Sequence, residues 1–343
     1  MRSRLGRRAV SLFGLLAGCG TLPPGAGPLP VRNQHPAQLL AAHPDPVPAQ
    51  VLPGGVALLR FDNAYTSLWL ISDNGPTRNS LFLDGETWRT ALDLRVGLGQ
   101  GLELEAELPF GYASGGFLDS FVIGWHDLFG FPDQGRRDNE RDAFAVEADR
   151  LGEAALSVEP HRFQIADTPL GLRARLLGDD TAALAVRAVV ELPTGDEEAG
   201  FGNGGVDVAV GLVGDVRVGD LSLFAHGHHT FVHTSAPARR AGLALRDVTA
   251  VGAGGILQVA PWLSLLLQTQ WETSVLRDLA IARAANEQWL LWAGFRVACS
   301  EHTFLELALG EDIGAYVSPD FTLWASFGGQ VGGTQGNAER RLP

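Results

Sequence analysis

The sequence predicts an all-β protein: an antiparallel up-and-down transmembrane β-barrel of about twelve strands, with one helical insert in an outer loop. Three observations predict it. Apolar and polar residues alternate along segments that are long enough to cross a bilayer. Short and long connections between these segments alternate along the chain. An export signal stands at the N-terminus.

The composition excludes several classes of protein. The chain has 343 residues and a formal net charge of −13, so we expect no nucleic-acid partner, because such proteins usually present a basic face. The hydrophobic share of 45% argues against disorder. No run of about 18 apolar residues could form a transmembrane helix. An apolar, glycine-rich chain of this kind forms either a soluble β-sandwich or a closed barrel in a membrane.

Residues 1–18 have the order of a bacterial signal peptide, with a positive start, an apolar stretch and small residues. The positive residues are Arg2, Arg4, Arg7 and Arg8. The apolar stretch ends in Leu16-Ala17-Gly18-Cys19, which looks like the lipobox of bacterial lipoproteins. We therefore expect cleavage before Cys19 and a lipid on that residue. The alternative is an ordinary signal peptide in which the cysteine stands by chance.

Residues 19–53 are rich in proline, glycine and alanine. We interpret them as an exposed, poorly structured lead-in to a barrel domain of residues 54–330. Residues 331–343 are expected to form a flexible C-terminal tail.

The alternation is clearest in two neighbouring segments. In residues 86–98, apolar side chains at even positions share one face and polar side chains share the other. In residues 102–112, Glu103, Glu105 and Glu107 lie on the polar face. Such segments are longer than the usual strand of about 5–6 residues. They match the roughly 9–11 residues that a strand needs to cross a bilayer.

Counting segments in this way gives an up-and-down order of strands. The expected strands are residues 54–72, 86–98, 102–112, 169–177, 182–193, 204–218, 221–233, 246–259, 262–275, 288–298, 302–309 and 320–329. The longer connections are residues 73–85, 113–168, 194–203, 234–245, 276–287 and 310–319. Outer-membrane barrels combine short periplasmic turns with long outer loops. We therefore expect an outer-membrane location with both termini periplasmic, on the side where a lipid on Cys19 would lie.

Residues 116–130 break the alternation, because their apolar residues recur at helical spacing. We expect a helix that either folds over the barrel mouth as a gate or packs against the rim. The candidate gating residues are Asp119, Trp125, His126, Asp127 and Arg136. Residues 143–166 alternate weakly and leave room for a hairpin beyond the membrane.

Charged side chains recur on the polar face, which would line the barrel lumen. The candidate lumen or ligand residues are Arg89, Asp93, Arg95, Glu103, Glu105, Glu107, Arg187 and Glu191. They either neutralise one another by cross-strand ion pairs in a closed lumen or form a polarised channel lining. The Glu-Leu-Pro-x-Gly sequences at residues 107–111 and 191–195 form a weak repeat, which we interpret as a repeated hairpin.

Two stretches resemble domain-of-unknown-function family 3187, a family of uncharacterised bacterial outer-membrane barrel proteins. The first is Gly27-Pro28-Leu29-Pro30-Val31-Arg32-Asn33-Gln34, and the second runs from Leu118 to Gly130 with Pro132, Gly135 and Arg136 after it. The resemblance covers residues 27–330 and implies an outer-membrane barrel without an established activity. Ordinary barrels end on an aromatic residue that the assembly machinery reads, whereas here Phe327 is followed by a tail.

Catalytic and metal sites receive little support from the sequence. His226 and His228 share a strand face and could place two imidazoles on one metal, but no carboxylate or cysteine completes the set. They are weak metal candidates, and a polar lumen lining is the alternative. No Gly-x-Ser-x-Gly elbow or other catalytic constellation occurs. We therefore expect no cofactor and no enzyme activity.

The expected function is that of an outer-membrane barrel which passes or binds a small or lipid-like solute beneath the helical insert. Its expected partners are the lipid bilayer, the outer-membrane assembly machinery and a small-molecule ligand. The alternatives are a structural or envelope-interaction barrel with a closed lumen and a lipid-anchored soluble β-sandwich. An outer-membrane hydrolase is less favoured.

Overall fold

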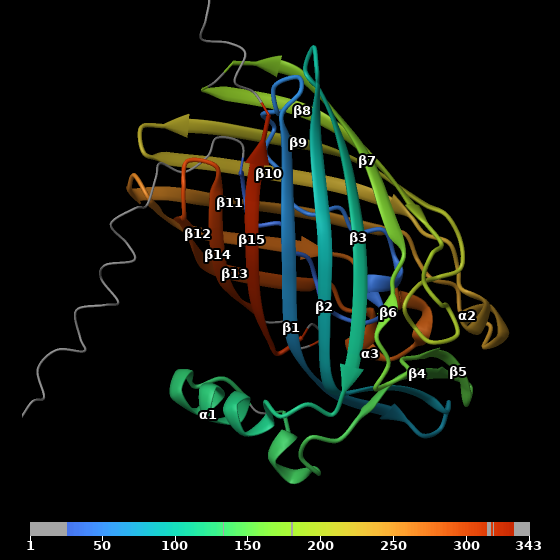
Figure 1. The fold of residues 1–343 in the computed structure, drawn as a ribbon. Coiled ribbons are helices and arrows are strands. Elements are labelled where there is room, and N and C mark those ends of the chain that lie inside the picture. Colours follow the sequence, from blue (N-terminus) through green and yellow to red (C-terminus); the bar gives the residue numbers. More distant parts are fainter. Residues whose placement is uncertain (1–25, 133, 180, 314–316, 318, 333–343) are drawn as a thin grey trace, which may run out of the picture.

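The computed structural model describes residues 26–132, 134–179, 181–313, 317 and 319–332. Twelve antiparallel strands form a closed ring (Figure 1). In ring order they are β1 (Ala57–Asn74), β2 (Asn79–Gly99), β3 (Leu102–Ser114), β7 (Thr168–Gly178), β8 (Ala182–Leu192), β9 (Asp207–Val218), β10 (Leu221–Phe231), β11 (Val248–Ala260), β12 (Leu263–Glu272), β13 (Gln288–Ala298), β14 (Thr303–Asp312) and β15 (Phe321–Val331). The pairing of β15 with β1 closes the ring. The predicted up-and-down barrel is thus confirmed, and the β-sandwich alternative is wrong because a single closed sheet forms.

Tight turns join neighbouring strands at one end of the ring, which we call the turn end; the longer connections lie at the loop end (Figure 1). The loop end carries the remaining elements. They are α1 (Asp119–Phe129), η3 (Arg136–Asp138), β4 (Ala145–Arg150), β5 (Glu153–Ser157), β6 (Gln164–Ile165), α2 (Ala236–Arg240), η4 (Arg277–Leu279) and α3 (Ala282–Ala285). The helix predicted at residues 116–130 is present as α1, and β4 and β5 form a hairpin within residues 143–166.

The ring has its apolar face outside and its polar face inside. On β12, the outward Leu265 and Leu267 are 48% and 56% exposed, whereas the inward Gln268 and Glu272 are 4% and 0% exposed. An apolar outer band is what a bilayer requires of a barrel wall, so the outer face contacts lipid. None of the helices in the described part of the chain is long and apolar enough to cross a membrane.

The prediction that residues 73–85 form a long connection is wrong. β1 and β2 continue through it as a paired hairpin, and only residues 75–78 form the turn. The reason is apolar burial beyond the ring, because Leu81 and Leu83 are 0% and 2% exposed inside a hydrophobic cluster.

The N-terminal lead-in was predicted to be exposed, and for residues 26–53 that prediction is wrong. The segment has little regular structure apart from the short helix η2 (Gln38–Leu40), but most of its residues are buried inside the ring. The polar inner face of the wall supplies hydrogen-bond partners that allow an irregular backbone to be buried. The predicted signal peptide, the lipid site at Cys19 and the tail from residue 333 lie outside the described residues.

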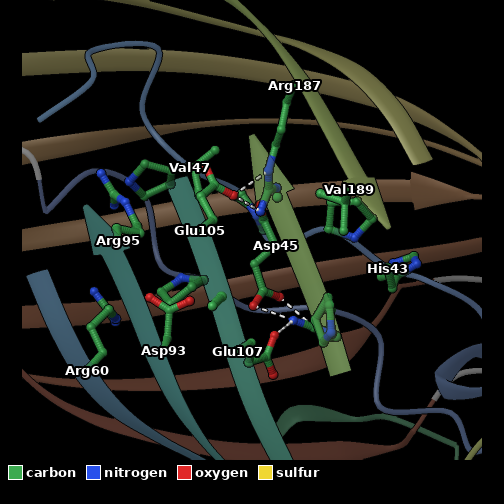
Figure 2. A pocket seen from close by; sticks show the side chains of 18 of the residues that line it. His43, Asp45, Val47, Arg60, Asp93, Arg95, Glu105, Glu107, Arg187 and Val189 are labelled. Carbon is green, nitrogen blue, oxygen red and sulfur yellow. Dashed lines mark hydrogen bonds and ion pairs between the residues drawn. The ribbon is translucent and has the colours of Figure 1, made fainter. Parts of the chain in front are cut away.

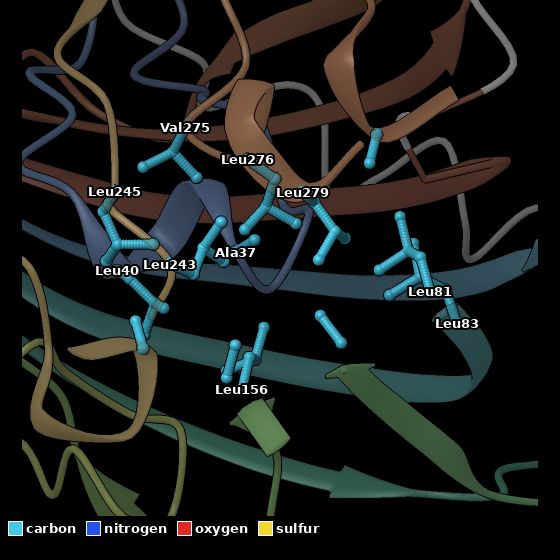
Figure 3. Packing of buried hydrophobic residues seen from close by; sticks show 14 of the residues in the cluster. Ala37, Leu40, Leu81, Leu83, Leu156, Leu243, Leu245, Val275, Leu276 and Leu279 are labelled. Carbon is cyan, nitrogen blue, oxygen red and sulfur yellow. The ribbon is translucent and has the colours of Figure 1, made fainter. Parts of the chain in front are cut away.

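A hydrophobic cluster covers the inside of the loop end (Figure 3). Leu40 of η2 packs there with Leu81 and Leu83 of β2. Leu243 and Leu276 enter the same cluster from the connections after β10 and β12. The N-terminal segment is therefore part of the packing that closes this end of the barrel.

Candidate functional site

Residues 26–53, which we call the plug, run up the lumen and back again. Near the turn end, the carbonyl of Gly27 accepts a hydrogen bond from Arg296 at 2.6 Å, and the N–H of Leu52 donates to Glu103 at 2.6 Å. Between these points the chain reaches the loop end, where η2 forms the tip of the plug. The plug thus has an ascending limb, a tip and a descending limb, and it leaves the lumen directly into β1.

Glu272 of β12 is the main anchor of the plug. Its carboxylate, which is 0% exposed, accepts hydrogen bonds from Asn33 at 2.7 Å and from Gln38 at 2.5 Å. His43 Nε2 lies 2.8 Å from the other carboxylate oxygen. These three residues come from the ascending limb, the tip and the descending limb, so one wall carboxylate holds all three parts together.

His35 lies on the ascending limb and is 2% exposed. Its Nδ1 accepts a hydrogen bond from the N–H of Ala37 at 3.1 Å. Burial lowers the pKa of His35 to about 4, although the Glu272 carboxylate acts in the opposite direction. The imidazole is therefore neutral at neutral pH and has no need of a counter-charge.

A second set of contacts joins the plug to the opposite wall (Figure 2). Arg32 donates to both oxygens of Asp45, at 2.7 and 2.6 Å, so the two limbs are tied to each other. The same guanidinium donates to Glu107 of β3 at 2.5 Å. Arg187 of β8 donates to the carbonyl of Asp45 at 2.6 Å and to Glu105 at 2.7 Å. Charge-assisted bonds of this kind are the stronger class of hydrogen bond.

The wall also pairs its own charges. Arg95 donates to Glu103 at 2.7 Å, and the fully buried Arg173 contacts both Glu103 and Glu105. Arg89 pairs with Glu107. Six of the eight predicted lumen residues are therefore in ion pairs, namely Arg89, Arg95, Glu103, Glu105, Glu107 and Arg187.

The other two predicted lumen residues behave differently. The side chains of Asp93 and Glu191 accept no hydrogen bond and make no ion pair with any residue that the structure describes. Asp93 lines a cavity of about 30 Å³ beside Arg32 and Arg60 (Figure 2). Such a volume has room for one or two water molecules. The plug therefore fills most of this part of the lumen.

The two predicted metal candidates also face the lumen. His226 and His228 line a cavity of about 10 Å³, and the His228 ring lies edge-on against His43 with 5.2 Å between ring centroids. Among the described residues, no group of three or more His, Cys, Asp or Glu side chains could hold a metal ion. These histidines pack against the plug as part of the lumen lining.

The candidate gating residues gather at the rim of the loop end. Arg136 is 2% exposed; it donates to Asp119 and Ser67 at 2.8 Å each and to Asp320 at 3.2 Å. Its guanidinium also lies over the ring of Trp69, 5.4 Å from the centroid. Burial raises the pKa of Asp320 to about 7, while Arg136 acts to lower it. This cluster ties the segment after α1 to β1 and to the residue before β15.

The helix α1 itself rests on the rim. Trp125 packs against Phe321 with 5.6 Å between ring centroids, and His126 Nε2 lies 3.7 Å from Glu311. Asp127 is largely exposed and pairs with Arg137. Figure 1 shows α1 beyond the loop end and outside the ring, whereas the plug runs inside it. A gating role of α1 stays a prediction.

Comparison with known proteins places this arrangement in a family. A family model described as "Protein of unknown function (DUF3187)" matches residues 23–328. The chain belongs to the DUF3187 family. The predicted resemblance is thus confirmed over most of the chain, including the plug and all of the ring except the last three residues of β15. No curated protein matches the DUF3187 chain.

Solved structures similar to this DUF3187 member are outer-membrane barrels. The COG4313 outer membrane channel from Pseudomonas putida F1 is 14% identical, with a TM-score of 0.55, and the match covers 84% of this chain and 100% of that one. The KdgM porin is 8% identical, with a TM-score of 0.42 and coverage of 79% and 98%. At these identities the likeness shows the fold alone, and it rests on the first match. The barrel is of the outer-membrane type.

The polar residues of the plug are the part of the DUF3187 site that the sequence pattern did not reveal. Arg32, Asn33, Gln38 and His43 were included in an exposed lead-in, yet each is buried and bonded to the wall or to the other limb. One signal was available: the polar run Arg32-Asn33-Gln34-His35 interrupts a stretch that is otherwise rich in proline and small residues.

Proposed function

We propose that this DUF3187 protein is a gated outer-membrane channel for a small or lipid-like solute, in which the plug is the gate. The proposal rests on the burial of the plug inside the ring, where it fills most of the lumen. It is held by hydrogen bonds and ion pairs to Glu272, Glu107 and Arg187, and such contacts can break and re-form. Solute passes when the plug leaves this position. The proposal assigns no catalytic step to the chain.

The direction of the barrel is part of the proposal. Short turns face the periplasm in outer-membrane barrels, so the turn end is the periplasmic end and the loop end faces outward. Both ends of the plug lie at the turn end, near Gly27 and Leu52. A lipid on Cys19 would then sit in the periplasmic leaflet, and the assembly machinery would receive the chain from the periplasm.

Planar-bilayer recordings of two proteins test the proposal. The full chain should show rare openings, and a variant lacking residues 28–50 should conduct almost continuously. Heat-modifiable migration in detergent confirms that each barrel has folded, since closed barrels resist unfolding. Because the deletion removes much buried surface, a second variant replaces Asn33, Gln38 and His43 with alanine; it should raise the open probability without shortening the chain. If both folded variants are silent, the plug is not the gate.

A second function, that of a structural barrel with a permanently closed lumen, is favoured by the cluster at the loop end. Leu40 of the plug is buried there with Leu81 and Leu243, and apolar packing of this kind resists displacement. The same recordings distinguish the two. A structural barrel would stay silent after the three alanine substitutions and would conduct only after the deletion.

A further inference from the structure

A second cavity lies between the plug and the wall, and it shares Arg32 with the cavity described above. Its volume is about 60 Å³. Pro36 and Leu39 of the plug form one side, and Phe201 and Val158 of the outer connections form another. Glu191, near the end of β8, lines the same cavity. Most of the other lining residues are apolar or aromatic, and the charged residues Arg32, Arg89 and Asp167 also line the cavity.

The side chain of Glu191 has no hydrogen-bond or ion-pair partner among the residues that the structure describes. Its side chain is 4% exposed, and its Oε2 is buried without a hydrogen bond. Glu107 occupies the matching position of the repeated Glu-Leu-Pro-x-Gly sequence. It forms ion pairs with both Arg32 and Arg89. These two arginines also line the cavity, but Glu107 and Asp45 already accept from them. A buried carboxylate without a donor is costly, so it takes up either a proton or a hydrogen bond from a ligand.

The neighbouring carboxylates already accept hydrogen bonds from the protein, and none of them donates a hydrogen bond to Glu191. Asp167, which also lines the cavity, accepts from the N–H groups of Gly195 at 2.8 Å and Asn203 at 2.9 Å. Asp207, paired with Glu191 across β8 and β9, accepts from the N–H of Ala42 at 3.0 Å. These bonds involve neutral donors, so they place no positive charge beside Glu191.

The shape of the cavity depends on close contacts between its sides. The ring of Phe201 packs on Gly111 of β3, where an added Cβ would lie 2.5 Å from the ring. Aromatic rings attract cations through their faces, in addition to packing against apolar groups. The cavity therefore combines the unpaired Glu191 carboxylate with an apolar and aromatic body, and the two arginines in its lining are paired with Glu107.

We propose that this cavity binds a small organic cation, an ammonium group on a short apolar body, with the ammonium donating to Glu191. The apolar body packs between Leu39 of the plug and Phe201 of the connection between β8 and β9. The ligand then bridges the plug and the wall, so its binding favours the docked plug. The site requires the docked plug but not conduction, and the two proposals can therefore fail separately.

Isothermal titration calorimetry on the folded full chain in detergent tests the site, with n-butylammonium as the probe. Neutral n-butanol and anionic butyrate have a similar body without the positive charge. We expect n-butylammonium to bind and the other two to bind at least tenfold more weakly. Glu191→Gln keeps the shape of the side chain and removes its charge, so it should weaken n-butylammonium at least about tenfold, the range of a charge-assisted bond.

Asp93→Asn is the matched control, because Asp93 is also an unpaired lumen carboxylate but lines the other cavity. It should leave the affinity for n-butylammonium unchanged. The absence of binding between pH 6 and pH 9 would show that Glu191 holds only a proton, and equal affinity in Glu191→Gln would place the cation elsewhere. Either result overturns the site. Heat-modifiable migration confirms that both variants fold.

Discussion

His43 Nε2 lies 2.8 Å from Glu272 Oε2, on the descending limb of the plug, while Asn33 of the ascending limb donates to Oε1 of the same carboxylate. Gln38 at the tip donates to Oε1 as well. One buried side chain of the wall therefore fixes the positions of two chain segments that run in opposite directions. The contact is polar throughout, in contrast to the leucine packing that surrounds the tip.

Glu272→Ala should loosen the plug. The substitution leaves the side chains of Asn33, Gln38 and His43 without their acceptor, and each unsatisfied buried group costs about 1–3 kcal/mol. We expect a higher open probability in planar bilayers and faster trypsin cleavage after Arg32. Ser264→Ala is the control, because Ser264 is buried on the same face of β12 and bonds to no described residue of the plug. Equal cleavage rates in both variants would show that Glu272 does not hold the plug in place.

Acid should also loosen the plug, through His35. The docked plug holds this imidazole with a pKa of about 4, below the ordinary value of about 6.5. Between these values the released plug binds a proton that the docked plug excludes, so docking weakens as pH falls from 6.5 towards 4. We expect the open probability to rise by up to about tenfold per pH unit in this window. His35→Gln should flatten the profile; an unchanged profile would assign the effect to another group.

Arg173→Met should destabilise the barrel. Arg173 is 0% exposed and contacts Glu103 and Glu105, so its loss leaves two buried carboxylates with fewer partners, at a cost of about 3–5 kcal/mol. Urea unfolding in phospholipid vesicles measures the change. The same substitution at the exposed Arg175, on the same strand, should stay within about 0.5 kcal/mol. Adding Glu105→Gln to Arg173→Met should recover part of the loss.

Leu267→Arg should impair insertion into the bilayer. Leu267 points outward from the middle of β12 and is 56% exposed on the lipid-facing side. A charged residue at the midplane of a barrel wall costs about 2–4 kcal/mol. The folded fraction in phospholipid vesicles, read from heat-modifiable migration, should fall. Leu128→Arg is the control, because Leu128 is 76% exposed on α1 outside the ring. Equal effects at both positions would contradict the lipid-facing assignment.

The strands could be predicted because the outer face of the wall meets lipid and the inner face is polar. Apolar and polar side chains therefore alternate along each strand. All twelve predicted strands are present, and most of their bounds agree to within three residues. β9 was predicted from residue 204 but begins at Asp207, whose carboxylate accepts from the N–H groups of Ala42 and His233. The β1–β2 hairpin was cut short in the prediction, because its outer part packs against a cluster built from distant loops.

The face of each lumen residue was predictable, but its partner was not. Alternation alone assigned Glu107 and Glu191 to the lumen, and the two stand in the same repeated sequence. The positions of Arg32 on the plug and Arg89 on β2 separate the paired carboxylate from the unpaired one. The plug itself has no period, since its backbone is irregular and its partners come from the wall. Its own residues therefore gave no sign of its burial beyond the polar run at residues 32–35.

The plug stands at the beginning of the described chain, whereas many of its partners stand near the end. Leu29 exchanges hydrogen bonds with Gln268, 239 residues away, and Arg296 reaches Gly27 across 269 residues. β1, directly after the plug, completes the ring only by pairing with β15. Contacts over such separations form late, because long loops must close first. Closure of the ring and filling of the lumen therefore belong to one late stage of assembly. An incomplete chain that lacks β12 and β13 loses the partners of Leu29, Gly27 and the Glu272 anchor, and keeps only the plug contacts to earlier strands such as β3 and β8.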